Sequence, residues 1–194
     1  KFVSTKLKVL RQINMIKSIA IDMDNVIADI ETHLVNWYER EYKVKVDRAA
    51  LLGVSEDEAF PDKKAARRFI HTPGFFRTVP LMPGALEAIE ILRKKYEIYI
   101  VSAATEFPLS LTEKHAWLAE YFPFISWRNI IFCGSKAVIK TDYMIDDHCK
   151  NLDYCIGKPI LFHASHNVNI KHHFRVQNWK EVLDYFEKEE KENH

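Results

Sequence analysis

The segment that decides how this chain folds reads Ile19-Ala20-Ile21-Asp22-Met23-Asp24-Asn25-Val26. Its apolar first half predicts a buried strand over residues 18–22, and the strand ends at two carboxylates one residue apart. Side chains alternate across a strand with period two, so Asp22 and Asp24 lean to the same side if the backbone stays extended. Two neighbouring acids repel each other and need a metal ion, a basic partner or a shared proton. In open α/β sheets ligands bind beyond the carboxyl ends of the strands, so we interpret the pair as a candidate for chemistry rather than packing.

Strand-like runs alternate with helix-like runs along the chain, which predicts a parallel sheet covered on both faces. The predicted strands span residues 18–22, 97–102, 129–133, 142–146 and 159–163. The predicted helices span residues 28–42, 85–95, 111–121 and 179–188, with short helices between 43 and 79, one opening near Pro61-Asp62, and a frayed end in the charged run 187–194. We therefore expect an α/β fold, a Rossmann-like and mostly parallel sheet flanked by helices, with a small helical cap inserted after the first strand.

This pattern divides the chain into three parts. Residues 15–28 and 81–194 are expected to form the core, and residues 29–80 the cap. Residues 1–14 carry basic side chains and no acid, and we expect them to be a poorly ordered leader.

The composition narrows the class of partner. Lys and Arg number 28 against 27 Asp and Glu, so neither a nucleic-acid polymer nor a membrane surface is an expected partner. No apolar run approaches the ~20 residues that span a bilayer. Cys133, Cys149 and Cys155 are too few and too irregularly spaced for a disulfide framework, which favours free thiols in a reducing compartment, the cytoplasm. A homodimer is compatible with the sequence.

Two groups of residues that often bind metals receive a structural interpretation. Cys149 and Cys155 match no familiar zinc spacing. The late histidines lack the i, i+4 spacing of a helical zinc motif; they are His163, His166, His172 and His173. We expect a structural or surface role for them.

Polar side chains stand at or just after four predicted strand ends, and the strand-tip rule gathers them at one crevice. They are Asp22 and Asp24, Ser102, Lys136, and Asp146 with Asp147. The acids suit a hard cation, which points to magnesium, an ion that often binds through one or two carboxylates and substrate phosphate. Lys136 supplies a point charge for phosphate and Ser102 a hydroxyl donor. Metal and lysine together would offset the repulsion between an anionic nucleophile and a phosphoryl group, while Asp24 would exchange protons with the leaving oxygen and with water.

Each of these residues has a plainer interpretation when taken alone. Asp22 and Asp24 would form a turn or a helix cap, and the acids at 146–147 would cap the next helix. Lys136 would be solvated, and Lys140 competes with it for any role. A convergent site is favoured because all of these residues occur together, each at the end of a successive predicted strand.

The ordered motifs resemble those of the haloacid dehalogenase-like phosphatases, and within that superfamily the 5'(3')-deoxyribonucleotidases. The similarity runs from residue 16 to residue 185, and its segments are residues 22–29, 74–76, 83–85, 113–117, 121–122, 143–147, 161–167 and 179–183. The resemblance implies a magnesium-dependent phosphomonoesterase that acts on deoxyribonucleoside monophosphates through an aspartyl-phosphate. Two alternatives stay open: a phosphatase of the same superfamily that acts on another small phosphorylated metabolite, and a non-catalytic phosphate-sensing domain.

The resemblance also implies a role for each position. Asp22 would be the nucleophile and Asp24 the general acid and base, with its backbone carbonyl on the metal. Asp22 and Asp147 would also bind the metal, and Asp146 would either support these ligands from beside them or serve as an alternative ligand. Phosphate would be bound at Ser102 and Ala103 and by Lys136.

Three departures from the family pattern bear on the site. Asn25 stands where glycine is usual, although Asn tolerates left-handed geometry better than most residues. Ala103 replaces a hydroxyl residue beside Ser102. The aromatic lining of the nucleobase pocket is thinner, since Ile30, Leu52 and Gly53 occupy positions where aromatics are expected; the candidate pocket residues are Ile30, Val54, Phe75 and Phe76.

Overall fold

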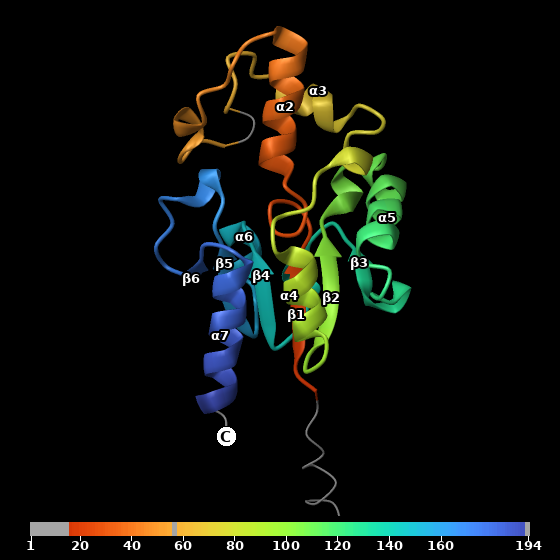
Figure 1. The fold of residues 1–194 in the computed structure, drawn as a ribbon, viewed down its shortest axis with the longest axis vertical. Coiled ribbons are helices and arrows are strands. Elements are labelled where there is room, and N and C mark those ends of the chain that lie inside the picture. Colours follow the sequence, from red (N-terminus) through yellow and green to blue (C-terminus); the bar gives the residue numbers. More distant parts are fainter. Residues whose placement is uncertain (1–15, 56–57, 193–194) are drawn as a thin grey trace, which may run out of the picture.

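The computed structural model describes residues 16–55 and 58–192, so the predicted leader lies outside the described residues. The strands are Ser18–Asp22 (β1), Glu97–Ser102 (β2), Ile130–Phe132 (β3), Tyr143–Asp146 (β4), Lys158–Phe162 (β5) and Phe174–Val176 (β6). The helices are Ile30–Tyr42 (α2), Ala65–Ile70 (α3), Ala85–Leu92 (α4), Ser110–Tyr121 (α5), Cys149–Leu152 (α6) and Trp179–Glu192 (α7). The strands form one sheet in the order β3-β2-β1-β4-β5-β6, and every neighbouring pair is parallel (Figure 1). The predicted parallel α/β fold is confirmed.

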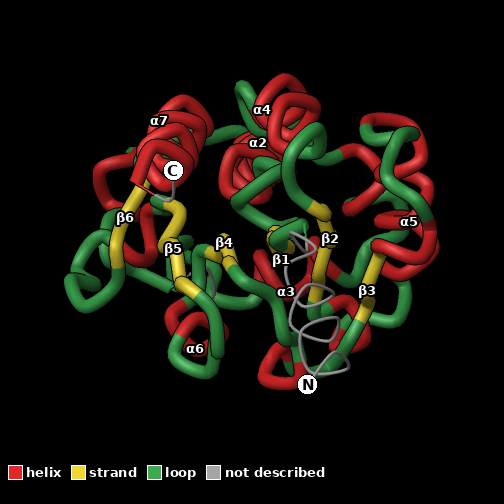
Figure 2. Tube along the Cα trace, turned by 90° about the horizontal axis from the view of Figure 1, so that it is seen from below, coloured by secondary structure: helices red, strands yellow, loops and turns green. Residues whose placement is uncertain are grey.

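The side chains of β1 alternate between two apolar cores, one on each face of the sheet. Ile19 and Ile21 belong to the larger cluster, which also contains Val182 of α7. Ala20 belongs to a smaller cluster with Leu152 of α6. Figure 2 shows α4 and α7 on one side of the sheet and α6 on the other. Because helices cover both faces, the central strand is apolar at successive positions rather than at alternate ones.

The strand order reverses its direction at β1. From β1 the chain adds β2 and β3 on one side, then returns to add β4, β5 and β6 on the other. Ligands of open α/β sheets bind at such a switch point, beyond the carboxyl ends of the strands. Asp22 ends β1, Asp146 ends β4, and these two strands pair directly. The topology therefore places both acids at the switch point.

The helical insertion after β1 is closed at its base by backbone contacts. The chain turns away from β1 at Asn25, whose φ of 55° lies in the left-handed region. Ala28 forms an antiparallel bridge with Leu81, and the backbone N–H of Asp29 donates to the carbonyl of Pro80 at 2.9 Å. The two ends of the insertion are thus joined, and α2 and α3 lie beyond the carboxyl ends of the strands (Figure 1). The predicted helical cap is confirmed as an element of the fold.

The edge strand β6 is not predicted from the sequence. It spans only Phe174–Val176, and it pairs with β5 alone. Its three residues alternate apolar and polar side chains but are too few to predict a strand, so its strand geometry depends on the neighbour it pairs with.

The helix predicted to open near Pro61-Asp62 begins instead at Ala65. The carboxylate of Asp62 accepts a hydrogen bond from the backbone N–H of Lys64 at 2.9 Å and another from the hydroxyl of Tyr42 at 2.5 Å. These bonds hold the segment as a turn, so the prediction of a first helical turn there is wrong.

The C-terminal helix is longer than predicted, because α7 continues to Glu192 rather than ending at 188. The carboxylate of Glu189 accepts a hydrogen bond from the Tyr143 hydroxyl at 3.0 Å and pairs with Lys158 at 2.6 Å. This anchor to β4 and β5 keeps the last described turns helical. Within residues 16–55 and 58–192, none of the helices combines the length and apolar character needed to cross a membrane.

Candidate active site

Three carboxylates meet at the carboxyl ends of β1 and β4. One carboxylate oxygen from each of Asp22, Asp146 and Asp147 lies within 4.8 Å of the others, and all three residues are buried. Lys136, which opens a short 3-10 helix after β3, is also buried and pairs with Asp22 at 2.5 Å and with Asp146 at 2.6 Å. Lys140, the competing lysine, is exposed. The structure therefore brings together the acids at the ends of β1 and β4 and the lysine that follows β3.

The charges at this cluster do not balance within the protein. Burial raises the pKa of Asp22 well above its ordinary value, repulsion from Asp146 adds to the increase, and Lys136 only partly opposes it. Burial alone would lower the pKa of Lys136, but attraction to Asp22 and Asp146 outweighs burial and raises it. Three hard oxygen donors with one ammonium group between them are the surroundings that a divalent cation stabilises, so the residues present fit magnesium.

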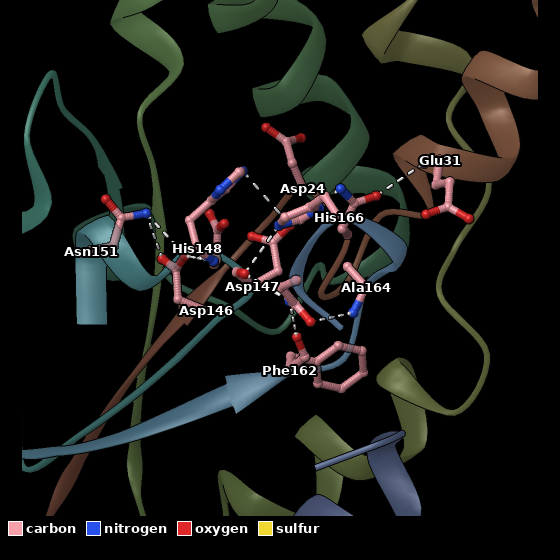
Figure 3. Close-up of polar contacts among 12 residues, drawn as sticks. Asp24, Glu31, Asp146, Asp147, His148, Asn151, Phe162, Ala164 and His166 are labelled. Atoms are coloured by element: carbon pink, nitrogen blue, oxygen red, sulfur yellow. Dashed lines mark hydrogen bonds and ion pairs between the residues drawn. The ribbon is translucent and has the colours of Figure 1, made fainter. Parts of the chain in front are cut away.

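The two adjacent acids of the cluster make different contacts. Asp146 accepts hydrogen bonds from Asn151 Nδ2 at 2.9 Å and from the backbone N–H of His148 at 2.9 Å, in addition to its ion pair with Lys136 (Figure 3). Asp147 Oδ2 accepts a hydrogen bond from Asn25 Nδ2 at 3.2 Å and lies 3.6 Å from His166 Nε2. Asp146 therefore holds Lys136 and Asn151 in place, whereas Asp147 faces the loop that follows β1.

The imidazole of His166 is neutral at physiological pH. Burial, followed by repulsion from His148, lowers its pKa to about 4. Its Nε2 lies 3.1 Å from the backbone oxygen of Asp147, and its ring stacks on that of His148 with centroids 4.4 Å apart. The neutral ring can therefore sit beside the acid cluster as a hydrogen-bond donor.

A second group centres on Lys114, which the sequence analysis did not predict as a site residue. Its ammonium group forms an ion pair with Asp24 and donates a hydrogen bond to Ser102 Oγ at 3.0 Å. The Lys114 side chain is only 1% exposed, and Nζ lies 4.6 Å from the centroid of the Phe76 ring. Asp22 and Asp24 thus have separate lysine partners, which resolves the repulsion expected from their spacing. The backbone does not stay extended beyond Asp22, but both side chains reach the same crevice.

The sequence does hold a signal for Lys114. It lies three and four residues before Trp117 and Leu118, the buried positions of α5, and so it belongs to the buried stripe of that helix. A lysine in such a stripe needs a partner for its charge, and only the fold reveals that the partner is Asp24.

Members of both groups line a crevice of about 630 Å³, a volume suited to a small ligand, whereas Ser102, Asp146 and Asp147 are buried. Its polar walls include Asp22, Asp24, Lys114 and Lys136, and its other lining residues include Ile30, Ala103, Phe76 and Phe107. Phe107, whose ring centroid lies 6.4 Å from that of Phe76, was not predicted from the sequence.

Two of the four predicted pocket residues do not line this crevice, so the prediction is corrected for them. Val54 lines a separate small cavity beside Leu34. Phe75 is fully buried and packs its ring edge against Trp37, with centroids 5.2 Å apart. Adjacent aromatic residues in a turn point to different sides, so Phe76 faces the ligand space while Phe75 fills the cap interior.

A family model described as "5' nucleotidase, deoxy (Pyrimidine), cytosolic type C protein" matches residues 14–190. The chain belongs to this family. A Bacillus subtilis relative named 5'(3')-deoxyribonucleotidase is 39% identical over 171 residues, covering 87% of this chain and 97% of its own. A Staphylococcus aureus relative is 38% identical over 171 residues, covering 88% of this chain and 95% of its own. The chain is therefore a phosphoric monoester hydrolase.

Solved structures support the fold. A haloacid dehalogenase family hydrolase from Deinococcus radiodurans with bound phosphate and sodium has a TM-score of 0.58 at 12% identity, covering 89% of this chain and 95% of that one. A hydrolase of the same superfamily from Bacillus subtilis bound to magnesium has a TM-score of 0.53 at 12% identity, covering 89% and 99%. At these identities the likeness concerns the fold alone.

The contacts of Lys114 predict its importance for turnover. Lys114→Met keeps the length of the side chain but removes the charge that holds Asp24 and Ser102, so we expect kcat/KM for an aryl phosphate to fall by about 100-fold or more. The exposed neighbour on the same helix provides the control, and His115→Ala should stay within about twofold of the unchanged enzyme. Equal activity in the two variants, with the fold verified by circular dichroism, would contradict a role for Lys114.

Proposed function

We propose that the enzyme is a magnesium-dependent phosphomonoesterase that hydrolyses deoxyribonucleoside monophosphates through a phosphorylated Asp22. The observation that carries the proposal is the pairing of two carboxylates with two buried lysines in one crevice, Asp22 with Lys136 and Asp24 with Lys114. The first pair suits a nucleophile, and the second suits a group that moves protons.

In the first step, a carboxylate oxygen of Asp22 attacks the phosphorus atom. The new bond from Asp22 to phosphorus forms as the bond from phosphorus to the ester oxygen breaks, and the leaving oxygen takes a proton from Asp24. Lys136 orients Asp22 and offsets the negative charge of the transferred group. Ser102 Oγ and the backbone at Ala103 would bind phosphoryl oxygens at the end of β2.

In the second step, water attacks the phosphorus atom of the acyl phosphate and Asp24 accepts its proton. The bond from Asp22 to phosphorus breaks, which releases inorganic phosphate and restores both carboxyl groups. Lys114 holds Asp24 through Oδ2, while the buried Oδ1 of Asp24 has no hydrogen-bond partner among the described residues and is the oxygen suited to exchange the proton.

The donor set fits a magnesium ion held by Asp22, Asp147 and the backbone carbonyl of Asp24. When bound, magnesium supplies positive charge that lowers the repulsion between the nucleophile and the phosphate dianion. Asp146 would then act by positioning Lys136, because its oxygens already accept bonds from Lys136 and Asn151. The magnesium bound by the Bacillus subtilis structural neighbour supports this choice of ion.

The cap segment, residues 29–80, would close the substrate space. Phe76 and Phe107 line the crevice and offer aromatic surface to a base, and the aliphatic side chain of Ile30 adds an apolar contact. The cap contacts the core where Ser165 Oγ donates to Glu31 Oε1 at 2.9 Å. The Bacillus subtilis relative's name supports a deoxyribonucleotide as substrate. The free thiols of the described cysteines suit a reducing compartment, and we propose the cytoplasm.

A second candidate substrate is another small phosphorylated metabolite. The observation that favours it is the thin aromatic lining, since Ile30, Leu52 and Gly53 replace aromatic residues near the expected base site. Gly53 also donates its backbone N–H to Ser165 O at 2.8 Å, so this part of the cap is fixed against the core.

The nucleophile is tested by Asp22→Asn. An amide cannot form the acyl phosphate, so turnover of an aryl phosphate should fall below detection, while Asp184→Asn on the exposed side of α7 should leave it unchanged. Retained turnover in purified Asp22→Asn protein would rule out Asp22 as the nucleophile. A stable phosphorylated form of the unchanged chain without turnover would instead indicate phosphate sensing.

The different contacts of the two adjacent acids predict different magnesium dependences. Asp147→Asn should raise the magnesium concentration for half-maximal activity by roughly 100-fold. Removing a residue that merely contacts a metal ligand already weakens metal binding by about 10–100-fold, and Asp147 is proposed as a ligand itself. Asp146→Asn should lower kcat through Lys136 with a smaller change in that concentration. Activity should disappear with a chelator and return with magnesium, and reversed behaviour of the two variants would overturn the ligand assignment.

The substrate is tested by a panel of dUMP, dTMP, 3'-monophosphates and sugar phosphates. We expect kcat/KM for a deoxyribonucleotide to exceed that for a sugar phosphate by about 10-fold or more, because stacking of one base contributes ~1–3 kcal/mol. Phe107→Ala should reduce this advantage without lowering turnover of glycerol phosphate. Faster turnover of a sugar phosphate would favour the second candidate.

A further inference from the structure

A second group of metal-binding side chains lies outside the crevice. One ligand atom from each of Cys149, His172 and His173 lies within 4.8 Å of the others. Cys149 is the first residue of α6, and the two histidines immediately precede β6. The fold thus joins residues that are more than 20 positions apart, a proximity that the sequence spacing did not indicate.

An acid adjoins the two histidines of this group. Asp153, which caps the C-terminus of α6, has its Oδ1 3.1 Å from His172 Nε2 and 2.8 Å from His173 Nε2. Histidines that bind a metal commonly donate their other ring N–H group to a carboxylate, which fixes the orientation of the ring. Asp153 therefore suits the role of a hydrogen-bond partner that holds both imidazoles beside Cys149.

We propose that Cys149, His172 and His173 form a zinc site whose imidazoles are held by Asp153. Thiolate and imidazole are the ligands that zinc prefers, and the three residues supply one sulfur and two nitrogens. His172 is 57% exposed, so its ring is free to adjust by the short distance that ligation requires. Three protein ligands leave the fourth position of a tetrahedral ion to water.

This site selects a different ion from the one proposed for the crevice. The crevice cluster offers carboxylate oxygens, which suit hard cations such as magnesium, whereas a thiolate selects against magnesium. Neither the three zinc ligands nor Asp153 line the crevice. The proposal therefore stands independently of the catalytic mechanism.

The site would fix one wall of the crevice from behind. It joins α6 to the segment between β5 and β6, residues 163–173. That segment carries His166, which lines the crevice and contacts the Asp147 backbone. Zinc binding would therefore stabilise the position of this segment and raise the melting temperature.

Cobalt(II) serves as the probe, because a cysteine thiolate bound to cobalt gives a charge-transfer band in the near ultraviolet that oxygen ligands do not give. The full chain is titrated with cobalt in excess magnesium. We expect one equivalent of cobalt to produce this band together with the visible bands of a tetrahedral ion, and one equivalent of zinc to abolish both. The same equivalent of zinc should raise the melting temperature.

Variants assign the signal to residues. Cys149→Ser should lose the charge-transfer band, while Cys155→Ser should keep it and serves as the matched control. His172→Ala, at an exposed position where folding is not at risk, should weaken cobalt binding by at least tenfold, and Asp153→Asn should weaken it as well. Asp147→Asn should keep the band, which separates this site from the crevice.

Three results would overturn the proposal. The first is the absence of a charge-transfer band from the unchanged chain, which would show that the histidines serve only as hydrogen-bond partners of Asp153. The second is a band that survives in Cys149→Ser. The third is loss of the band in Asp147→Asn, which would show that the cobalt site is not independent of the crevice.

Discussion

The repulsion among Asp22, Asp146 and Asp147 is the constraint on which the site depends. Two strands that pair directly at the switch point of the sheet end in acids, so the fold cannot keep these carboxylates apart. Buried Lys136 holds two of them, and the pKa of Asp22 remains raised despite that lysine. The structure therefore retains excess negative charge where a divalent cation and a phosphoryl group would be bound, which is costly for stability and useful for catalysis.

The second lysine separates the roles of Asp22 and Asp24. Because Lys114 reaches Asp24 from α5, this acid is oriented independently of the acid cluster. The same lysine bonds to Ser102 at the end of β2, so three elements are tied together at the crevice: the loop after β1, the end of β2 and α5. A nucleophile and a proton-transfer group can then differ in environment although they are two residues apart.

The local pattern of apolar residues was sufficient to predict much of the architecture. The apolar runs predicted five of the six strands, and their alternation with helices predicted the parallel sheet and the inserted cap. The short strand β6 was missed because three residues are too few to establish an alternating pattern, and its pairing with β5 supplies the order. The start of α3 was misplaced because Asp62 is engaged by Tyr42 from another helix, a contact that no local pattern reveals.

By itself the sequence determined which residue types stand at the strand ends, since strand periodicity and the strand-tip rule act through neighbours in the chain. It therefore indicated Asp22, Asp24, Ser102, Lys136 and the acids at 146–147 as a set, and the family resemblance assigned them expected roles. Only the tertiary structure decided which lysine pairs with which acid. It also decided that Phe76 and Phe107 rather than Phe75 line the crevice, and that Cys149 lies beside His172 and His173. These are long-range contacts, and their geometry depends on how separate elements pack rather than on the spacing of residues along the chain.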